Sequence, residues 1–154
     1  AHPSALIGEL PLGPPQNLVP FITQSAAGLR GPLQVYGKDY PTADGTAVRD
    51  YIHVVDLALA HIAAMDHLMR QEGGDMHVFN LGTGKGSSVL SVIQAFEDAT
   101  GTALSWAFAP RRAGDVVAAY ADTERAASVL GWRAQRSLAD SMKDAWRWQE
   151  GLPS

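Results

Sequence analysis

The stretch Gly45-Thr46-Ala47-Val48-Arg49-Asp50-Tyr51-Ile52-His53-Val54-Val55-Asp56-Leu57-Ala58 decides the fold of this chain. It places an arginine, two carboxylates, a tyrosine and a histidine beside a short apolar segment. The pattern predicts a strand from Arg49 to Val54 that passes directly into a helix, with Asp56 in the first turn. An arginine at the mouth of such a strand can present a fixed guanidinium to an anion. The alternative is an exposed ion pair between Arg49 and Asp50, which would contribute little stability.

Hydrophobic periodicity and turn residues predict short strands and helices on both sides of this stretch. Irregular chain is expected over 1–15. The other expected strands are 33–36, 76–81, 104–108 and 118–121. The expected helices are one capped by Asn17 and ended by Gly28, one over 57–69, one from about 88 to 99, one capped by Asp122 or Thr123, and one opened by a Ser137–Asp140 capping box. The sequence therefore predicts a single α/β unit.

Composition limits the classes of function. The 154 residues suffice for one domain that buries about 70% of its unfolded surface. The net charge of −4 provides no field that attracts nucleic acid, and no apolar run approaches the roughly 18 residues of a membrane helix. Cysteine is absent, which excludes disulfides and thiolate metal sites. We therefore expect a cytoplasmic protein with neither nucleic acid nor membrane as partner.

A glycine-rich segment and a pair of histidines suggest binding motifs, but neither has the required spacing. The glycines at 82, 84 and 86 follow a predicted strand, but the dinucleotide-binding fingerprint needs two residues before its third glycine. Lys85 precedes the last glycine, which excludes a phosphate-binding P-loop as well. We expect this segment to form a tight turn. His61 and His67 are too far apart on their helix to share a metal, so His61 is predicted to be a core histidine and no metal site is expected.

Four separated segments resemble the UDP-glucose 4-epimerases, NAD-dependent members of the extended short-chain dehydrogenase/reductase family. They are Ala1 to Ser4 with Asn17-Leu18, Leu33 to Thr42, Gly45 to Ala58, and Asn80 to Gly84 with Pro110 to Asp115; Leu130-Gly131-Trp132 adds a shared ending. The resemblance covers the whole chain. It implies that residues 1–154 form the single UDP-sugar-binding, C-terminal domain of such an enzyme. The implied fold class is α/β (α+β-like), with small mixed sheets and packed helices.

The resemblance implies a clamp for a UDP-sugar. Arg49 and Arg112 would grip the diphosphate through charge-assisted hydrogen bonds. Tyr51 would support the phosphate-binding arginine. Asn17 would hydrogen-bond near the junction of phosphate and sugar, with Leu18 alongside it.

The nucleoside end of the ligand would be held by other residues. Gln34 and Tyr36 would bracket the uracil, chiefly through the backbone of their strand, and Asp115 would accept a hydrogen bond from a ribose hydroxyl. Two structural alternatives stay open here. Asp115 could form a salt bridge to one of the arginines at 111–112, and Tyr36 could be an ordinary core residue of its strand.

Ala119 bears on specificity. Family members carry either a tyrosine or a small residue at this position, and a small residue leaves room for an N-acetyl group at sugar C2. The resemblance therefore implies that the intact enzyme also accepts UDP-N-acetylglucosamine and UDP-N-acetylgalactosamine.

The catalytic parts of the family are missing from this chain. The family uses a Tyr-x-x-x-Lys pair backed by a serine or threonine, but none of the four tyrosines has a lysine four residues later. The glycine-rich NAD fingerprint is absent too. The sequence therefore resembles the C-terminal half of the enzyme, without the N-terminal Rossmann half. The isolated chain is expected neither to bind NAD nor to epimerise UDP-galactose. The intact enzyme would be an NAD-dependent isomerase of galactose metabolism, and a homodimer.

Two alternatives remain at this stage. One is the substrate domain of another NAD-dependent nucleotide-sugar enzyme, such as a different epimerase, a dehydratase or a decarboxylase. The other is a stand-alone, non-catalytic module that binds nucleotide sugars. A stand-alone module should have a closed core, whereas a partial chain should expose a large apolar face, for which the helix from Leu57 to Met69 is the best candidate.

Overall fold

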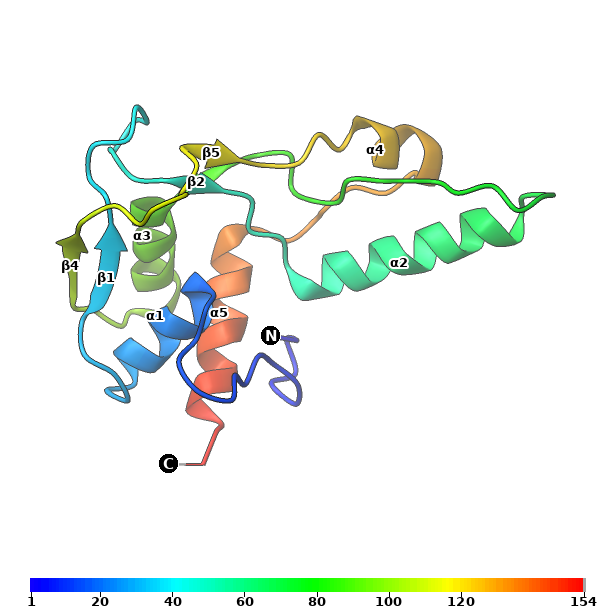
Figure 1. Ribbon diagram of the computed structural model, residues 1–154. Coiled ribbons are helices and arrows are strands. Elements are labelled where there is room, and N and C mark those ends of the chain that lie inside the picture. The colour runs from blue at the N-terminus through cyan, green and yellow to red at the C-terminus, as the bar shows by residue number, and fades with distance from the viewer. Residues whose placement is uncertain (154) are drawn as a thin grey trace.

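The chain forms a helical lobe and a projecting arm, with a small sheet between them (Figure 1). The structure is a computed structural model that describes residues 1–153. In Figure 1 the lobe lies to the left and the arm, made of α2, α4 and the segment 70–82, extends to the right. The elements are α1 (Leu18–Ala26), β1 (Leu33–Tyr36), β2 (Val48–Arg49), α2 (Val54–Met69), β3 (Ser87–Ser88), α3 (Val89–Thr100), β4 (Trp106–Ala109), β5 (Ala118–Ala119), α4 (Glu124–Leu130) and α5 (Leu138–Glu150).

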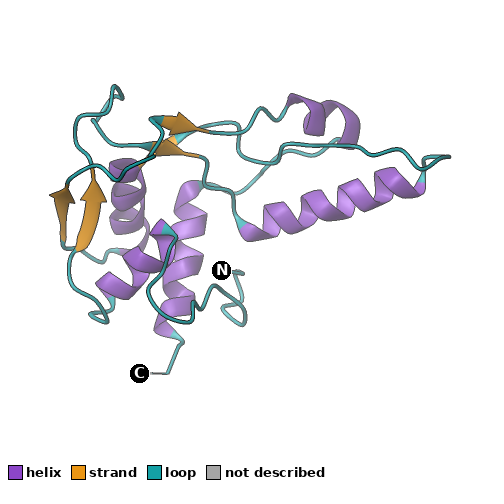
Figure 2. Ribbon diagram, in the orientation of Figure 1, coloured by secondary structure: helices purple, strands orange, loops and turns teal. Residues whose placement is uncertain are grey.

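The strands form two small sheets, and irregular chain makes up much of the rest (Figure 2). β1 and β4 pair in parallel, with Leu33 opposite Trp106. In the second sheet β2 lies between β3 and β5, antiparallel to β3 and parallel to β5. The register of β2 and β5 places Arg49 opposite Ala119. The expected small mixed sheets with packed helices are confirmed.

The core of the lobe lies between β1 and the helices α1, α3 and α5. Its fully buried side chains include Ile22 of α1, Phe96 of α3 and Met142 of α5. Helix α5 begins at the predicted capping box, in which Ser137 Oγ accepts from Asp140 N and the Asp140 carboxylate accepts from Ser137 N. Packing of these helices against one face of β1 leaves the other face of that strand at the surface.

The predicted strand from Arg49 to Val54 is wrong beyond its first residue. The strand is only Val48–Arg49, and α2 begins already at Val54. His53 occupies the N-cap position of α2, and its Nδ1 accepts a hydrogen bond from Val55 N at 3.1 Å. The carboxylate of Asp50 binds a neighbouring turn, as described below. These two side-chain contacts end the strand because they draw the chain out of the sheet.

Three further expectations are wrong. Residues 76–81 are irregular, because among residues 1–153 no strand pairs with them. His61 is exposed instead of buried, because the described chain leaves that face of α2 uncovered. Asn17 occupies the N-cap position of α1, but its side chain donates to Glu9 Oε1 at 2.8 Å and does not cap the helix. Among the same residues, none of the helices is long and apolar enough to cross a membrane.

Asp56 joins the arm to the lobe. Its side chain is only 1% exposed and accepts hydrogen bonds from Gln135 N at 2.8 Å, Arg136 N at 2.7 Å and Arg136 Nη1 at 2.7 Å. Burial by itself would raise the pKa of this carboxyl, but the backbone N–H groups of Arg136 and Gln135 and the Arg136 guanidinium together lower the pKa below its ordinary value.

We expect Asp56→Asn to destabilise the protein by about 3 kcal/mol at neutral pH, because it leaves a buried donor set partly unpaired. Since the folded-state pKa of Asp56 is lowered, its contribution is present above the unfolded pKa of about 3.9 and is lost as the pH falls through the folded value. The measurement is urea unfolding of the protein between pH 7 and pH 3. Asp66→Asn, at an exposed position of α2, is the control. A gap between Asp56→Asn and the parent that stays constant down to pH 3 would contradict this assignment.

Candidate functional site

Arg49 and Arg112 meet on one carboxylate. Arg112 Nε donates to Asp115 Oδ2 at 3.0 Å and Arg112 Nη2 donates to Asp115 Oδ1 at 3.3 Å. Arg49 Nη2 lies 3.7 Å from Asp115 Oδ1. The structural alternative for Asp115, a salt bridge to an arginine at 111 or 112, is therefore present, and Arg49 joins it. Two guanidinium groups and one carboxylate leave an excess of positive charge at this point.

The Arg49 guanidinium is held in place by backbone carbonyls. Arg49 Nη1 donates to Val48 O at 2.8 Å and to Val116 O at 2.9 Å. Its side chain is 31% exposed, and that of Arg112 is 57% exposed. Arg49 is thus the fixed member of the pair and Arg112 the more solvated one, and both are accessible to a ligand.

Tyr36 completes this group at the end of β1. The Arg112 guanidinium carbon lies 4.8 Å from the centre of the Tyr36 ring, within the range of a cation–π contact. Tyr36 is 39% exposed, so the alternative of an ordinary core residue is wrong. Gln34 is exposed two residues earlier on the same face of β1, and its Nε2 donates to Pro32 O at 3.3 Å. We call Tyr36, Arg49, Arg112 and Asp115 the arginine cluster.

The other predicted site residues lie around this cluster or apart from it. Ala119 lies opposite Arg49 in the sheet. Tyr51 packs against the lobe core; burial raises the pKa of its hydroxyl, and the charge of Arg49 partly opposes this rise. Leu18 packs against the same core, at the start of α1. Asn17 gives its side-chain hydrogen bond to Glu9 rather than to the arginine cluster.

Sequence reasoning missed Asp50. Its carboxylate accepts hydrogen bonds from Thr83 N, Thr83 Oγ1, Gly84 N and Ala121 N, at 2.6–3.3 Å. A Cβ atom at Gly82 would collide with this carboxylate, which explains why the turn needs glycine there. The chain bends at Gly82, Gly84 and Lys85, and Gly84 adopts a left-handed φ of 71°. The alternative ion pair between Asp50 and Arg49 is wrong, because Arg49 pairs with Asp115 instead. The signal in the sequence was an aspartate beside the key arginine combined with a Gly-Thr-Gly turn.

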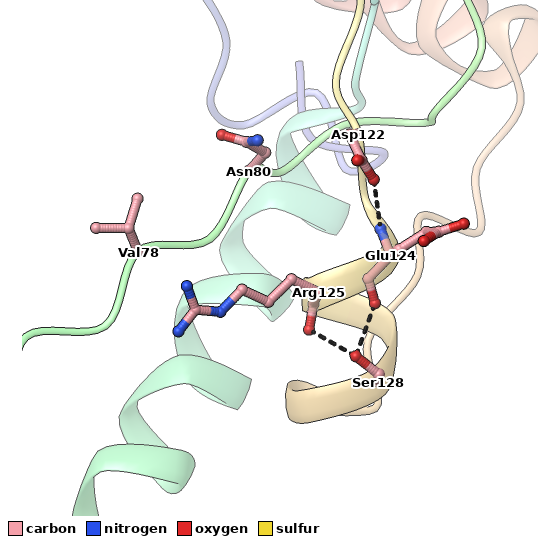
Figure 3. A pocket seen from close by; sticks show the side chains of 6 residues that line it. All are labelled: Val78, Asn80, Asp122, Glu124, Arg125 and Ser128. Atoms are coloured by element: carbon pink, nitrogen blue, oxygen red, sulfur yellow. Dashed lines mark hydrogen bonds between the residues drawn. The ribbon is translucent and has the colours of Figure 1, made fainter.

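Two cavities lie away from the arginine cluster. One of about 490 Å³ lies on the arm and is lined by Val78, Asn80, Asp122, Glu124, Arg125 and Ser128. Figure 3 shows Arg125 reaching from α4 toward segment 76–81, and its guanidinium carbon lies 5.3 Å from the centre of the Phe79 ring. The second cavity, of about 420 Å³, lies between the N-terminal segment and the starts of α1 and α2. Neither is lined by a predicted site residue, although the second adjoins Leu18 and Tyr51 through their neighbours Val19 and Ile52.

Comparison with known proteins places the chain in a family. The model of the GDP-mannose 4,6 dehydratase family matches residues 3–145. The chain belongs to this family. The curated relatives that it matches include proteins named UDP-glucose 4-epimerase. The protein of that name from Yersinia pestis is 55% identical over 153 residues, which are 99% of this chain and 45% of the relative. The one from Bacillus subtilis is 50% identical and is matched over 97% of this chain and 43% of its own length.

Solved structures of the family agree with these matches. The UDP-glucose 4-epimerase from Stenotrophomonas maltophila, with bound NAD and formylated UDP-arabinopyranose, superposes with a TM-score of 0.94 at 53% identity, over 97% of this chain and 44% of that one. The enzyme from Bifidobacterium longum, in complex with NAD+ and UDP, gives 0.91 at 49% identity, over the same shares of the two chains. The chain spans about 45% of the length of its curated relatives and corresponds to their C-terminal part. The resemblance to UDP-glucose 4-epimerases and the implied fold are confirmed.

Proposed function

We propose that this chain is the UDP-sugar-binding domain of an NAD-dependent UDP-glucose 4-epimerase, a cytoplasmic isomerase that interconverts UDP-galactose and UDP-glucose. The observation that carries this proposal is the arginine cluster, in which two arginines from distant parts of the chain lie on one carboxylate. A diphosphate requires fixed cations, and planar guanidinium groups match its oxygens in a bidentate manner.

The geometry suggests how the nucleotide binds. A diphosphate competes with Asp115 for both guanidinium groups, because each arginine can turn its donors from the carboxylate to phosphate oxygens. The displaced carboxylate then has free acceptor oxygens for a ribose hydroxyl. Tyr36 and Gln34 lie on the exposed face of β1 next to Arg112, where they flank a uracil ring. In this proposal Tyr51 supports Arg49 from the core side.

The sugar end of the ligand lies toward α1. Asn17 and Leu18 are at the first turn of this helix, beside the cavity of about 420 Å³. We assign Asn17 to the junction of phosphate and sugar, which requires that it exchange its hydrogen bond to Glu9 for one to the ligand. This exchange is between equivalent polar contacts at the surface and costs little.

The residues present do not fit NAD. A nucleotide pyrophosphate is usually cradled by free backbone N–H groups of a glycine-rich turn. In this chain the N–H groups of Thr83 and Gly84 already donate to Asp50. We therefore place NAD, together with the catalytic tyrosine, lysine and serine or threonine, in an N-terminal Rossmann half of the intact protein.

An exposed apolar face supports the presence of that second half. Helix α2 exposes Leu59 (45%), Ile62 (55%), Met65 (61%) and Leu68 (52%). Val78, on the neighbouring segment 76–81, is 60% exposed as well. Soluble domains rarely expose so continuous an apolar surface, so it favours a partial chain over a stand-alone module. In this proposal the N-terminal half covers α2, and the intact enzyme is a homodimer.

Product analysis on the intact protein tests the proposal. With UDP-galactose and NAD, we expect conversion to UDP-glucose until both sugars are present at equilibrium. Because the matching family model is named after a dehydratase, the second candidate is a nucleotide-sugar 4,6-dehydratase, which would release water and give a 4-keto-6-deoxy sugar. Formation of that sugar without UDP-glucose would favour the second candidate. The 50–55% identity to epimerases favours the first.

Ala119 gives a prediction about specificity. Its methyl group is exposed in β5, beside the arginine cluster. We expect the intact protein also to epimerise UDP-N-acetylglucosamine, and Ala119→Tyr to reduce that activity at least about 10-fold, because the larger ring occupies the space of the N-acetyl group. The activity on UDP-galactose in the same assay is the control and should change less than about threefold. Equal activities of the parent and Ala119→Tyr on the N-acetyl sugar would show that the size of residue 119 does not control acceptance of the N-acetyl group.

A further inference from the structure

We propose that Asp50 is a positioning residue that holds Arg49 in its ligand-binding place. This inference deepens the proposed function and rests on it, since it concerns the same diphosphate site. Asp50 has no contact with Asp115 or Arg112 among its hydrogen bonds. Its effect on a ligand therefore has to pass through the backbone that carries Arg49.

The Asp50 carboxylate ties three separate segments together. Oδ1 accepts from Thr83 Oγ1 at 2.6 Å and from Thr83 N at 3.0 Å. Oδ2 accepts from Ala121 N at 3.2 Å and from Gly84 N at 3.3 Å. The carboxylate thus connects the end of β2, the Gly82–Gly84 turn and the chain that leaves β5. A carboxylate suits this place because it is an acceptor only and offers about four lone-pair directions.

The pairing of β2 with β5 depends on such support because both strands have only two residues. Strands in proteins usually have three residues or more, and each backbone hydrogen bond adds only about 1 kcal/mol. Along this short pair, Val48 N donates to Val117 O at 2.9 Å and Arg49 Nη1 donates to Val116 O at 2.9 Å. The bond from Ala121 N to Asp50 fastens the other end. Loss of that bond weakens the β2–β5 pairing, and with it the hold on Val116 and Asp115, two of the groups that contact Arg49.

Asp50→Asn removes this support while nearly preserving side-chain size. An asparagine replaces one acceptor oxygen by an NH₂ donor, and in either orientation this donor faces at least one backbone N–H of Thr83, Gly84 or Ala121. At least one buried or half-buried donor then loses its partner. Asp56→Asn is the matched control, because Asp56 also accepts two backbone N–H bonds but lies at the junction of α2 and α5, away from the β2–β5 pair.

The test measures UDP affinity of the intact protein by calorimetry, for the parent, Asp50→Asn, Asp56→Asn, Arg49→Ala and the double variant Asp50→Asn/Arg49→Ala. We expect Asp50→Asn to weaken UDP binding by about 10-fold, and Asp56→Asn by less than about twofold. In the double variant, the loss should be smaller than the product of the two single losses, because the part of the Asp50 effect that passes through Arg49 is already gone. If Asp50→Asn does not fold, Thr83→Val removes one donor to the same carboxylate, and we expect it to weaken UDP binding by about threefold.

Two results would overturn the positioning role alone: UDP affinity of Asp50→Asn equal to that of Asp56→Asn, or a loss in the double variant equal to the product of the two single losses. If Asp50→Asn cannot be folded, unchanged UDP affinity in Thr83→Val would overturn the positioning role instead. A different result identifies failure of the proposed function. If Arg49→Ala binds UDP as tightly as the parent, the diphosphate site itself is misassigned, and the role of Asp50 falls with it.

Discussion

Replacing Arg49 or Arg112 by alanine in the intact protein is expected to weaken UDP binding about 10- to 150-fold. The physical reason is that each charge-assisted hydrogen bond contributes about 1.5–3 kcal/mol, and 1.4 kcal/mol corresponds to a factor of ten. We expect Arg49→Ala to lie toward the upper end, because two carbonyls already fix its guanidinium and less conformational entropy is lost on binding. Arg112 is more exposed, so its bonds are partly screened by water. Calorimetric titration with UDP measures both effects.

Two further variants separate guanidinium geometry from simple charge. Arg49→Lys keeps the positive charge but loses the planar fork, and we expect it to recover only part of the lost affinity. Arg125→Ala removes an arginine that lies against Phe79 in the cavity on the arm (Figure 3), and UDP affinity should stay unchanged. A large loss in Arg125→Ala together with normal binding in both cluster variants would move the nucleotide site to that cavity.

The second large effect concerns this chain on its own, without the N-terminal half that we propose. The 154-residue chain alone should show no turnover of UDP-galactose and should not retain NAD after purification. It lacks a Tyr-x-x-x-Lys pair, and its Gly-Thr-Gly turn gives its N–H groups to Asp50. Loss of the general base alone typically lowers a rate by 10²–10⁴-fold, and loss of the hydride acceptor removes the reaction. A coupled assay for UDP-glucose, with the intact protein as positive control, measures this.

Turnover by the isolated chain would contradict the proposal that NAD and the catalytic residues belong to an N-terminal half. Because α2 exposes a row of apolar side chains, the isolated chain should also tend to associate with itself at high concentration. Circular dichroism before the assay distinguishes an inactive folded chain from an unfolded one.

Local signals in the sequence predicted several elements correctly. The Ser137–Asp140 capping box marked the start of α5, and Gly101 marked the end of α3, where it adopts a left-handed φ of 68°. The period-two alternation of Leu33–Tyr36, bounded by Pro32 and Gly37, predicted β1 with its correct ends. These signals succeed because caps, turn glycines and amphipathic strands depend on neighbours in the sequence.

Long-range pairing explains the errors. Residues 76–81 have the composition of a strand, but strand formation requires a neighbouring strand, and among residues 1–153 none pairs with them. The predicted strand at 49–54 was cut short by Asp50, whose partners lie more than thirty residues away in the chain. His61 was predicted to be buried because of the apolar pattern of its helix, but the pattern could not show that this face of the helix stays uncovered.

For the candidate site, the residues could be predicted but their arrangement could not. The resemblance to epimerases supplied the nine predicted site residues. Only the folded chain shows that Arg49 and Arg112 both contact Asp115 and that Tyr36 lies beside Arg112. No spacing in the sequence indicates such a meeting, because it depends on the parallel pairing of β2 with β5. The supporting role of Asp50 was hidden for the same reason.

The central claim is that these two arginines share one diphosphate, and the most direct measurement compares UDP with uridine. Both ligands are titrated into the intact parent and into the double variant Arg49→Ala/Arg112→Ala. The account predicts that UDP affinity falls by at least about 100-fold, whereas the weaker affinity for uridine, which has no phosphate, changes less than about threefold. Equal losses for UDP and uridine, or no loss for UDP, would contradict it.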